Sequence, residues 1–333
     1  MKGGLSGCNH WVGLRLLIDE VVADAAREAM WTKHQCSLCC QSIQIDGVWK
    51  DVRAVVADGL TALKFAKCSF YDCRQDILPG AGQRYCAFHD AEHGDKCAVN
   101  SPQQCPNSHE PDRLTCEYHR PWEDTYYRYY RRGSYHATAQ ARAAGTVNEP
   151  AFITYLRSMF ATRFIHGYMI ASFGCGIVAG LAPLWESEGD QQAAWALNEI
   201  FRHAQHLPDI LFYDRSCFRR RWLINNPDPF WLRTICLVDR WHFYAHTQHD
   251  CGEFCSPEKV DCPLLWRTDG DRAPIYRWNS SRAESTNSWI FGLGNIVKPM
   301  PRGLNQMVLG INVSVYNETL LGGMMHRNPT FRV

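Results

Sequence analysis

The sequence carries almost no net charge. Its 35 lysines and arginines nearly balance its 34 aspartates and glutamates. The chain as a whole therefore exerts no strong attraction on a phosphate polymer, and any binding of nucleic acid must come from local clusters of basic residues.

The sequence also lacks a run suited to a membrane-spanning helix. The uncharged stretch 167–185 contains several glycines and Pro183, which are poor material for such a helix. The apolar stretch 12–18 is broken by Arg15 and followed by two acids, so it does not resemble a secretory leader. We expect neither membrane insertion nor a secreted disulfide scaffold.

Apolar residues and cysteines are plentiful. The 333 residues are 46% apolar and 12% aromatic, which is enough for a sizeable core. Sixteen cysteines lie in the chain, many of them beside histidines at short spacing. A reducing, intracellular compartment in which metal ions bind the thiolates explains this pattern best.

The periodicity of apolar residues predicts a mixed α/β sheet. A buried strand ends in Asp58-Gly59, and 60–65 is a candidate return strand. Further strands are predicted over 177–184, 209–214 and 236–243. Helices are predicted over 11–33, 150–170 and 190–206, and from 282 onward.

A polar segment interrupts this pattern. From Cys68 to His119 the chain is rich in Cys, His, Gly, Pro and Asn without sustained periodicity, which indicates an inserted module that metal must hold together. The predicted organisation is an N-terminal helix and partial cysteine motif, the first strands of the core, the inserted module, and the remainder of the core: 1–50, 51–67, 68–120 and 121–333.

The inserted module contains enough ligands for two tetrahedral Zn²⁺ ions. Ligand pairs two to four residues apart suit one ion, because a single turn then offers both side chains. The alternative is a set of buried or disulfide-bonded cysteines, but the recurring histidines favour metal. The candidate ligands are Cys68, Cys73, Cys86, His89, Cys97, Cys105, Cys116 and His119.

A second set of candidate zinc ligands follows later in the chain. It comprises His242, His246, Cys251 and Cys255, with Cys262 as a spare. The alternative is that the two histidines merely share a polar helix face. Cys36, Cys39 and Cys40 contain one Cys-x2-Cys pair without an obvious partner pair, so their role stays open.

Seven short motifs occur along the chain. They are VVADG (55–59), RYCAFH (84–89), KCAV (96–99), LTCEYH (114–119), FYDRSC (212–217), DRWHFYAH (239–246) and NSSRAE (279–284). In this order and spacing they resemble the Kyakuja-Dileera-Zisupton (KDZ) transposases that carry an associated cysteine-cluster module. The resemblance extends over roughly residues 36–310.

The resemblance implies an RNase H-like DDE catalytic domain that cuts and joins DNA with two metal ions. Asp58, Asp214 and Glu284 are then the catalytic carboxylates. Hard carboxylate oxygens suit Mg²⁺ or Mn²⁺, and two such ions stabilise the attacking and leaving oxygens. Zn²⁺ would be structural.

Each acid also has a simpler interpretation. Asp58 could form a turn, Asp214 could cap a helix, and Glu284 could be a solvated helix residue. Asp239 competes with Asp214 as the second acid, although its neighbours match the histidine motif instead. Ser281 stands where relatives often have an additional acid.

Two basic clusters are candidate DNA contacts. Arg128, Arg131 and Arg132 alternate with tyrosines that could stack on bases. Arg219, Arg220 and Arg221 follow the second acid closely enough to reach a phosphate backbone. Either cluster could instead be an ordinary exposed face.

The sequence therefore points to two functions. One is an active transposase in the nucleus, whose partners are transposon ends and target DNA. Whether such a protein forms a homo-oligomer stays open. The other is a catalytically inactive or domesticated zinc-containing protein that binds DNA or other partners. Only the first requires the three carboxylates to meet in one site.

Overall fold

The computed structural model describes twelve stretches of the chain and divides it into two compact units. We call residues 1–65 with 165–333 the sheet unit and residues 66–164 the cysteine unit. The helix predicted over 11–33 lies outside the described residues. The described stretches are 36–70, 73–75, 77, 84–99, 105–131, 151–160, 163–185, 189–202, 204, 207–246, 249–268 and 272–327.

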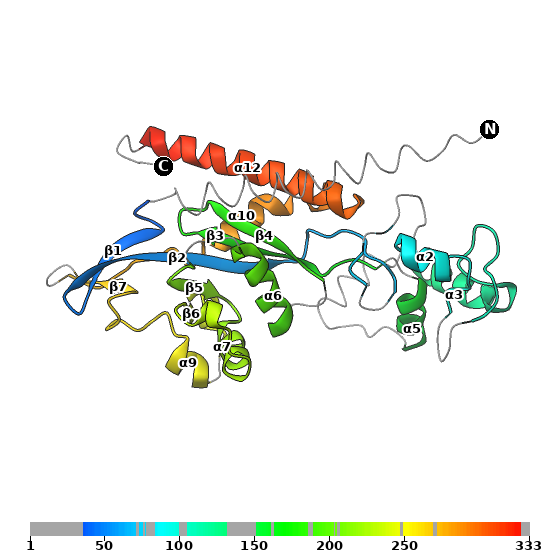
Figure 1. The fold of residues 1–333 in the computed structure, drawn as a ribbon, viewed down its shortest axis with the longest axis horizontal. Helices are drawn as coiled ribbons and strands as arrows, with labels where there is room; N and C mark the ends of the chain where they lie inside the picture. Colours follow the sequence, from blue (N-terminus) through cyan, green and yellow to red (C-terminus); the bar gives the residue numbers. More distant parts are fainter. Residues whose placement is uncertain are drawn as a thin grey trace. The chain divides into compact units, whose positions relative to one another are not determined.

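The sheet unit is built on a mixed six-stranded sheet (Figure 1). The strands run in the order β4-β3-β2-β5-β6, and β1 pairs with the first part of β2. Pairing is parallel between β2 and β5 and between β5 and β6, and antiparallel elsewhere in this sheet. The bounds are β1 Cys40–Ile45, β2 Val48–Leu60, β3 Gly167–Phe173, β4 Val178–Leu184, β5 Ile210–Tyr213 and β6 Ile235–Leu237.

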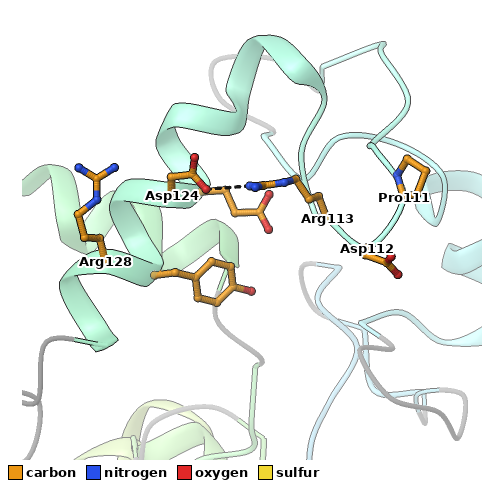
Figure 2. A pocket seen from close by; sticks show the side chains of 7 residues that line it. Pro111, Asp112, Arg113, Asp124 and Arg128 are labelled. Atoms are coloured by element: carbon orange, nitrogen blue, oxygen red, sulfur yellow. Dashed lines mark hydrogen bonds and ion pairs between the residues drawn. The ribbon is translucent and has the colours of Figure 1, made fainter.

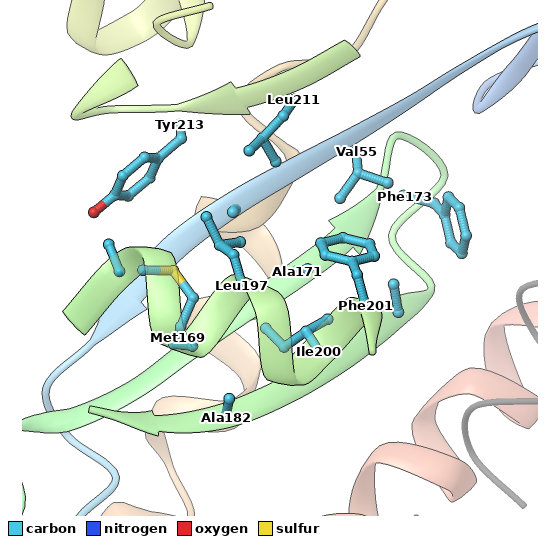
Figure 3. Packing of buried hydrophobic residues seen from close by; sticks show 14 of the residues in the cluster. Val55, Met169, Ala171, Phe173, Ala182, Leu197, Ile200, Phe201, Leu211 and Tyr213 are labelled. Carbon is cyan, nitrogen blue, oxygen red and sulfur yellow. The ribbon is translucent and has the colours of Figure 1, made fainter. Parts of the chain in front are cut away.

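Helices cover both faces of this sheet. On one face, α6 (Asp190–Phe201) packs Leu197 and Ile200 against odd-numbered strand residues such as Val55 and Leu211 (Figure 3). On the other face lie α10 (Arg282–Phe291) and α12 (Arg302–Arg327) (Figure 1). Because successive strand residues point to opposite faces, the even-numbered residues of β2 and β5 face α10.

The remaining described elements of the sheet unit are short. All of them follow β5 in the chain. They are α7 Ser216–Asn225, η2 Pro229–Trp231, α8 Arg240–Phe243, α9 His249–Phe254, β7 Trp266–Arg267, β8 Ile275–Tyr276 and α11 Gly294–Val297.

The cysteine unit contains little regular structure. Its described helices are α2 (Ala87–His93), η1 (Glu117–His119), α3 (Arg120–Arg131) and α5 (Ala151–Phe160). Leu156, Met159 and Phe160 of α5 bury against Cys97, Cys105 and Cys116, so cysteine side chains form part of a small core. The unit continues beyond residue 120, the end of the predicted insertion, because α3 and α5 belong to it.

The uncharged stretch 167–185 forms the β3–β4 hairpin. Every residue of β3 is buried, which explains the absence of charge, since both faces of the sheet are covered here. Gly176 takes a φ of +99° in the turn, a conformation that L side chains rarely adopt. No helix in the described part of the chain is long and apolar enough to cross a membrane.

Three predicted elements are wrong in type or extent. Residues 61–65 form no strand, and the hairpin partner of β2 is β1, which precedes it. The helix predicted over 150–170 ends at Phe160, and β3 begins at Gly167. The strand predicted over 236–243 ends at Leu237, because the Asp239 carboxylate accepts hydrogen bonds from Trp241 and His242 backbone N–H groups and starts α8.

Two buried asparagines attach α12 to the sheet. Asn317, 1% exposed, accepts a hydrogen bond from the Val178 backbone N–H (2.9 Å) and donates one to the Val178 carbonyl (3.1 Å). Asn305 donates to the Lys64 and Val297 carbonyls and accepts from the Tyr168 hydroxyl. These side chains satisfy backbone groups that burial would otherwise leave unpaired.

We therefore expect Asn317→Leu to lower the free energy of unfolding by about 1–3 kcal/mol, because it leaves buried backbone donor and acceptor groups of Val178 unsatisfied. Denaturant unfolding followed by circular dichroism measures this change. Asn312→Leu on the same helix is the matched control, since Asn312 is half-buried and donates only to Val308 of its own helix. Equal stability loss in the two variants would contradict the proposed role of Asn317.

Candidate metal centres and acidic site

The first ligand group lies in the cysteine unit and consists of Cys68, Cys73, Cys86 and His89. The His89 Nδ1 atom lies 3.5 Å from the Cys68 Sγ and 3.3 Å from the Cys86 Sγ, and the Cys73 and Cys86 sulfurs are 3.8 Å apart. Zn–S bonds of about 2.3 Å and Zn–N bonds of about 2.0 Å place tetrahedral ligands roughly 3.5–3.8 Å apart. This set of three cysteines and one histidine, a CCCH group, therefore fits a zinc ion.

The second ligand group repeats this chemistry with Cys97, Cys105, Cys116 and His119. The His119 Nδ1 atom lies 3.4 Å from the Cys97 Sγ and 3.5 Å from the Cys116 Sγ, while the Cys105 and Cys116 sulfurs are 4.0 Å apart. These spacings again match a tetrahedral CCCH site. All eight candidates from the inserted module thus fall into two complete groups.

Both groups share a local design in which a cysteine precedes a helix. Cys86 stands before α2 and Cys116 before η1, and a histidine follows each three residues later. Burial raises the pKa of each thiol. Hydrogen bonds from backbone N–H groups of the first turn and from neighbouring thiols lower the pKa, and together they outweigh burial. The net pKa of both thiols is lowered, which favours the thiolate that a metal ion requires.

A third group involves the Cys-x2-Cys pair that had no partner in the sequence. Cys36 and Cys39 have their sulfurs 3.2 Å apart and are joined by Cys175 from the β3–β4 turn. All three side chains are buried. The flanking Gly174 is essential to this approach, because a Cβ there would lie 2.6 Å from the Leu38 carbonyl oxygen. This cluster of three cysteines is consistent with a structural zinc site.

A fourth group lies beside β6 and α7. The His246 Nδ1 atom lies 3.5 Å from the Cys217 Sγ and 3.4 Å from the Cys251 Sγ. Cys255 is fully buried in the same cluster. Burial, followed by the neighbouring thiols of Cys251 and Cys255, raises the pKa of Cys217 to about 12, so the thiolate form needs a compensating cation.

His242 does not lie in this fourth group, although the sequence assigned it there. Its Nδ1 atom lies 2.6 Å from the Asp239 Oδ2, and its Nε2 atom 3.6 Å from the Glu284 Oε1. Burial lowers its pKa, but the hydrogen bond to Asp239 and the nearby carboxylates outweigh burial and raise the pKa above the ordinary value. Cys217 takes the place in the thiol cluster that was expected for His242.

The register of the parallel strands brings two predicted catalytic acids together. Ala57 of β2 pairs with Tyr213 of β5, so Asp58 and Asp214 follow on neighbouring strands. Adjacent strands lie about 4.8 Å apart, and paired residues of parallel strands point to the same face. Because Val56 belongs to the cluster beneath α10, Asp58 points toward that helix. Asp214 directly follows β5, and its Oδ1 atom lies 3.0 Å from the His246 Nε2 atom.

Helix α10 brings the third acid to the same face. Asn287 donates a hydrogen bond from Nδ2 to the Asp58 Oδ2, and Glu284 lies one turn earlier on that helix. Residues three apart are neighbours on a helix surface. Glu284 also faces His242, which shares a ligand group with Asp214 and Asp239. Asp58 is thus linked to α10 through Asn287, and Asp214 and Glu284 both lie near His242, which places the three predicted acids at the same edge of the sheet. Among the described residues, the group whose ligand atoms all lie within 4.8 Å of one another contains Asp214, Asp239 and His242, without Asp58 or Glu284.

Asp239 extends this row, because Leu237 pairs with Phe212 and Asp239 then stands opposite Asp214. The two acids differ in their existing bonds. Asp239 is 4% exposed, caps α8 and contacts His242. The Asp214 side chain is 38% exposed. A partly open carboxylate is better placed to bind a cation from solvent, which favours Asp214 over Asp239.

The three arginines of α7 that were expected to contact DNA differ in their burial. Arg219 is 1% exposed, and its guanidinium carbon lies 4.5 Å from the Trp231 ring centroid. The prediction that Arg219 contacts DNA is therefore corrected, because this side chain is buried in the core. Arg220 lies over Phe254 and Arg221 over Phe218, and both are half-buried.

The basic cluster on α3 is described only in part. Arg128 lines a cavity of about 650 Å³ whose other charged residues are Arg113 and three acids, Asp112, Glu123 and Asp124. Figure 2 shows Arg113 directed at Asp124, with the ion pair at 2.8 Å. This mixture of charges does not single out the cavity as a phosphate site. The Arg131 side chain and all of Arg132 lie outside the description.

Three residues of these sites were absent from the predicted set. Cys175 joins Cys36 and Cys39 only because the β3–β4 hairpin turns beside them. Cys217 stands three residues after Asp214 in the FYDRSC motif, but no nearby ligand pair signalled it. Asn287 has no distinguishing neighbour in the sequence, although its spacing of three from Glu284 places it on the same helix face.

Together, these features define a mixed α/β protein with clusters of cysteine and histidine ligands. Residues 56–125 match a family described as "CxC6 like cysteine cluster associated with KDZ transposases". The chain therefore carries a cysteine cluster of this kind, which confirms the resemblance to that cluster, and the matched segment contains both CCCH groups. Comparisons with curated proteins and with solved structures gave no match.

We expect Cys86→Ser and Cys116→Ser each to lower the zinc content by one ion per chain, because each removes a ligand from a different CCCH group. Elemental analysis of gently purified protein measures the stoichiometry. Cys262→Ser is the control, since Cys262 lies outside the four groups found in the described residues. Less than one zinc per chain in the unmodified protein would contradict the assignment.

Proposed function

We propose that the sheet unit is the RNase H-like catalytic core of a DDE-type transposase and that it cuts and joins DNA strands. Support comes from the strand order, in which three antiparallel strands, β2, β3 and β4, are extended by two strands parallel to β2. The association of the matched cysteine cluster with KDZ transposases agrees with this proposal.

The proposal is supported by the placement of the three acids at one edge of the sheet: Asp58 contacts Asn287 of α10, and Asp214 and Glu284 both lie near His242. Carboxylates on adjacent parallel strands repel one another, and divalent cations relieve that repulsion. Two Mg²⁺ or Mn²⁺ ions, bound roughly 3.5–4 Å apart, would supply an activated oxygen nucleophile and stabilise the leaving oxygen. The donor set fits such hard cations, since all three side chains end in carboxylate oxygens.

The protein side chains provide position and charge for this chemistry. Asp58 is held by the Asn287 amide and by its own contact with the Gly59 backbone N–H. Glu284 lies on α10, whose Ala283 and Ile290 pack into the core and restrict its movement. A rigid arrangement of ligands lowers the cost of assembling the site when DNA binds.

The cysteine unit has a structural role in this proposal. Its two CCCH groups are closed sites with four protein ligands, which suits stabilisation and not catalysis. Arg128, Arg220 and Arg221 are the described candidates for contact with the DNA backbone, and a transposase would meet its DNA in the nucleus. The fifteen cysteines within the described residues form no disulfide bonds, as expected for metal ligands in a reducing compartment.

A catalytically inactive, zinc-containing protein that binds DNA or other partners is the second candidate. The observation that favours it is that the matched family covers only the cysteine-cluster segment, residues 56–125, and not the acids Asp214 and Glu284. The resemblance to KDZ transposases also implies an additional acid at the position of Ser281, at the N-terminal boundary of α10. Such a protein would bind zinc and DNA, with affinity that falls steeply as salt rises, and would not cleave.

We expect Asp58→Asn to abolish Mg²⁺- or Mn²⁺-dependent nicking of a DNA duplex while the zinc content stays unchanged. The amide keeps the shape of the side chain but removes the negative charge that binds the cation. Asp58 is preferred over Asp214 for this test, because Asp214 contacts His246 of the fourth ligand group.

The control for this experiment is Asp51→Asn, an exposed carboxylate on β2 that lies outside the acidic site. It should nick DNA at the rate of the unmodified protein. Cleavage that needs no divalent metal, or that survives in Asp58→Asn, would refute the proposed mechanism. Zinc and DNA binding without any cleavage would support the second candidate instead.

A further inference from the structure

We propose that Cys217, His246, Cys251 and Cys255 bind a zinc ion and that this ion positions Asp214 through the imidazole ring of His246. The inference rests on the proposed role of Asp214 as a ligand for the catalytic cation. It adds a function for the fourth ligand group, which would orient the acidic site as well as stabilise the fold.

The ligands come from three separate segments of the chain. Cys217 lies in the first turn of α7, His246 follows α8, and Cys251 lies in α9. The Cys255 backbone N–H donates to the Cys251 carbonyl at 3.2 Å, so the two thiols are one helical turn apart. All three cysteines are buried, and such a cluster of thiols has the composition of a closed zinc site.

The His246 ring connects this group to the acidic site. Its Nδ1 atom faces the thiols at 3.4–3.5 Å, and its Nε2 atom lies 3.0 Å from the Asp214 Oδ1. A metal ion bound to Nδ1 leaves the proton on Nε2, so the ring becomes a fixed hydrogen-bond donor to Asp214. Carboxylate–histidine–zinc arrangements of this kind orient both partners.

A second link runs through the backbone. Asp214 and Cys217 are separated by a short turn between β5 and α7, so a metal ion that binds Cys217 also restrains the backbone that carries Asp214. The Asp214 carboxylate is therefore restrained both by its hydrogen bond with His246 and by the backbone that connects it to Cys217. With one oxygen bound to His246, the plane of the carboxylate is restrained while its other oxygen is directed for a second partner.

The two histidines of the DRWHFYAH motif thus have different environments. His242 contacts Asp239 and faces Glu284, with no thiol in its ligand group. His246 stands between the thiols and Asp214. Of the two histidines, only His246 contacts both the thiols and Asp214, which makes this residue the point at which to test the side-chain link.

The test replaces the connecting ring and keeps the zinc site. In His246→Cys a thiolate takes the place of the imidazole, so the group then offers four thiolates and still suits zinc. We expect unchanged zinc content and manganese affinity weaker by roughly tenfold to a hundredfold, the range for loss of a partner that orients a metal ligand. Mn²⁺ titration followed by electron paramagnetic resonance measures this without DNA cleavage.

The matched control is His119→Cys, which makes the same change from a CCCH group to four thiolates in the cysteine unit, where no proposed catalytic acid contacts the ring. Its manganese affinity should equal that of the unmodified protein. Full manganese affinity in His246→Cys, with zinc retained, would overturn the proposal. An equal loss of affinity in both variants would also overturn it, because the effect would then not depend on contact with Asp214.

A reciprocal measurement applies even where His246→Cys folds poorly. Asp214→Asn should release one zinc ion to a chelator about tenfold faster than the unmodified protein, because His246 loses its carboxylate partner. Asp58→Asn should release zinc at the unmodified rate. Equal release from all three proteins would overturn the link. Faster release from Asp214→Asn in a protein that never cleaves DNA would support the link while the proposed nuclease function fails.

Discussion

The parallel pairing of β2 with β5 is the constraint on which the acidic site depends. It places Asp58 beside Asp214 at the ends of neighbouring strands. Neutral side chains at these two positions would create no local concentration of negative charge. Carboxylates instead create a concentration of negative charge that is favourable only when cations or histidines lie close by, as His242 does.

Candidate metal ligands form part of the core in the cysteine unit. Apolar side chains from α5, such as Leu156 and Phe160, pack with buried cysteines as well as with apolar and aromatic side chains such as Val99 and Tyr126. The two CCCH groups of this unit are consistent with structural zinc sites, at which the free energy of metal binding would contribute directly to folding. The sheet unit, by contrast, has continuous apolar clusters on both faces of its strands.

The parts of the fold that followed from the sequence were those with local signals. The apolar run before Asp58 and the helix over 190–201 depend on periodicity within a few residues. The misplaced elements had competing signals. Residues 167–173 are apolar enough for helix or strand, and their pairing with β2 makes them a strand, while Asp239 ended a predicted strand by capping a helix.

The sequence by itself determined the candidate ligand chemistry of this protein. Three of the four ligand pairs in the cysteine unit have spacings that one turn can present to one ion: Cys68/Cys73, Cys86/His89 and Cys116/His119. Tertiary structure alone decided which distant residues complete the other sites. Cys175 joins Cys36, and Cys217 joins His246 in place of His242. Such groupings arise because strand pairing and helix packing bring together residues far apart in the chain, and spacing along the sequence carries no record of that proximity.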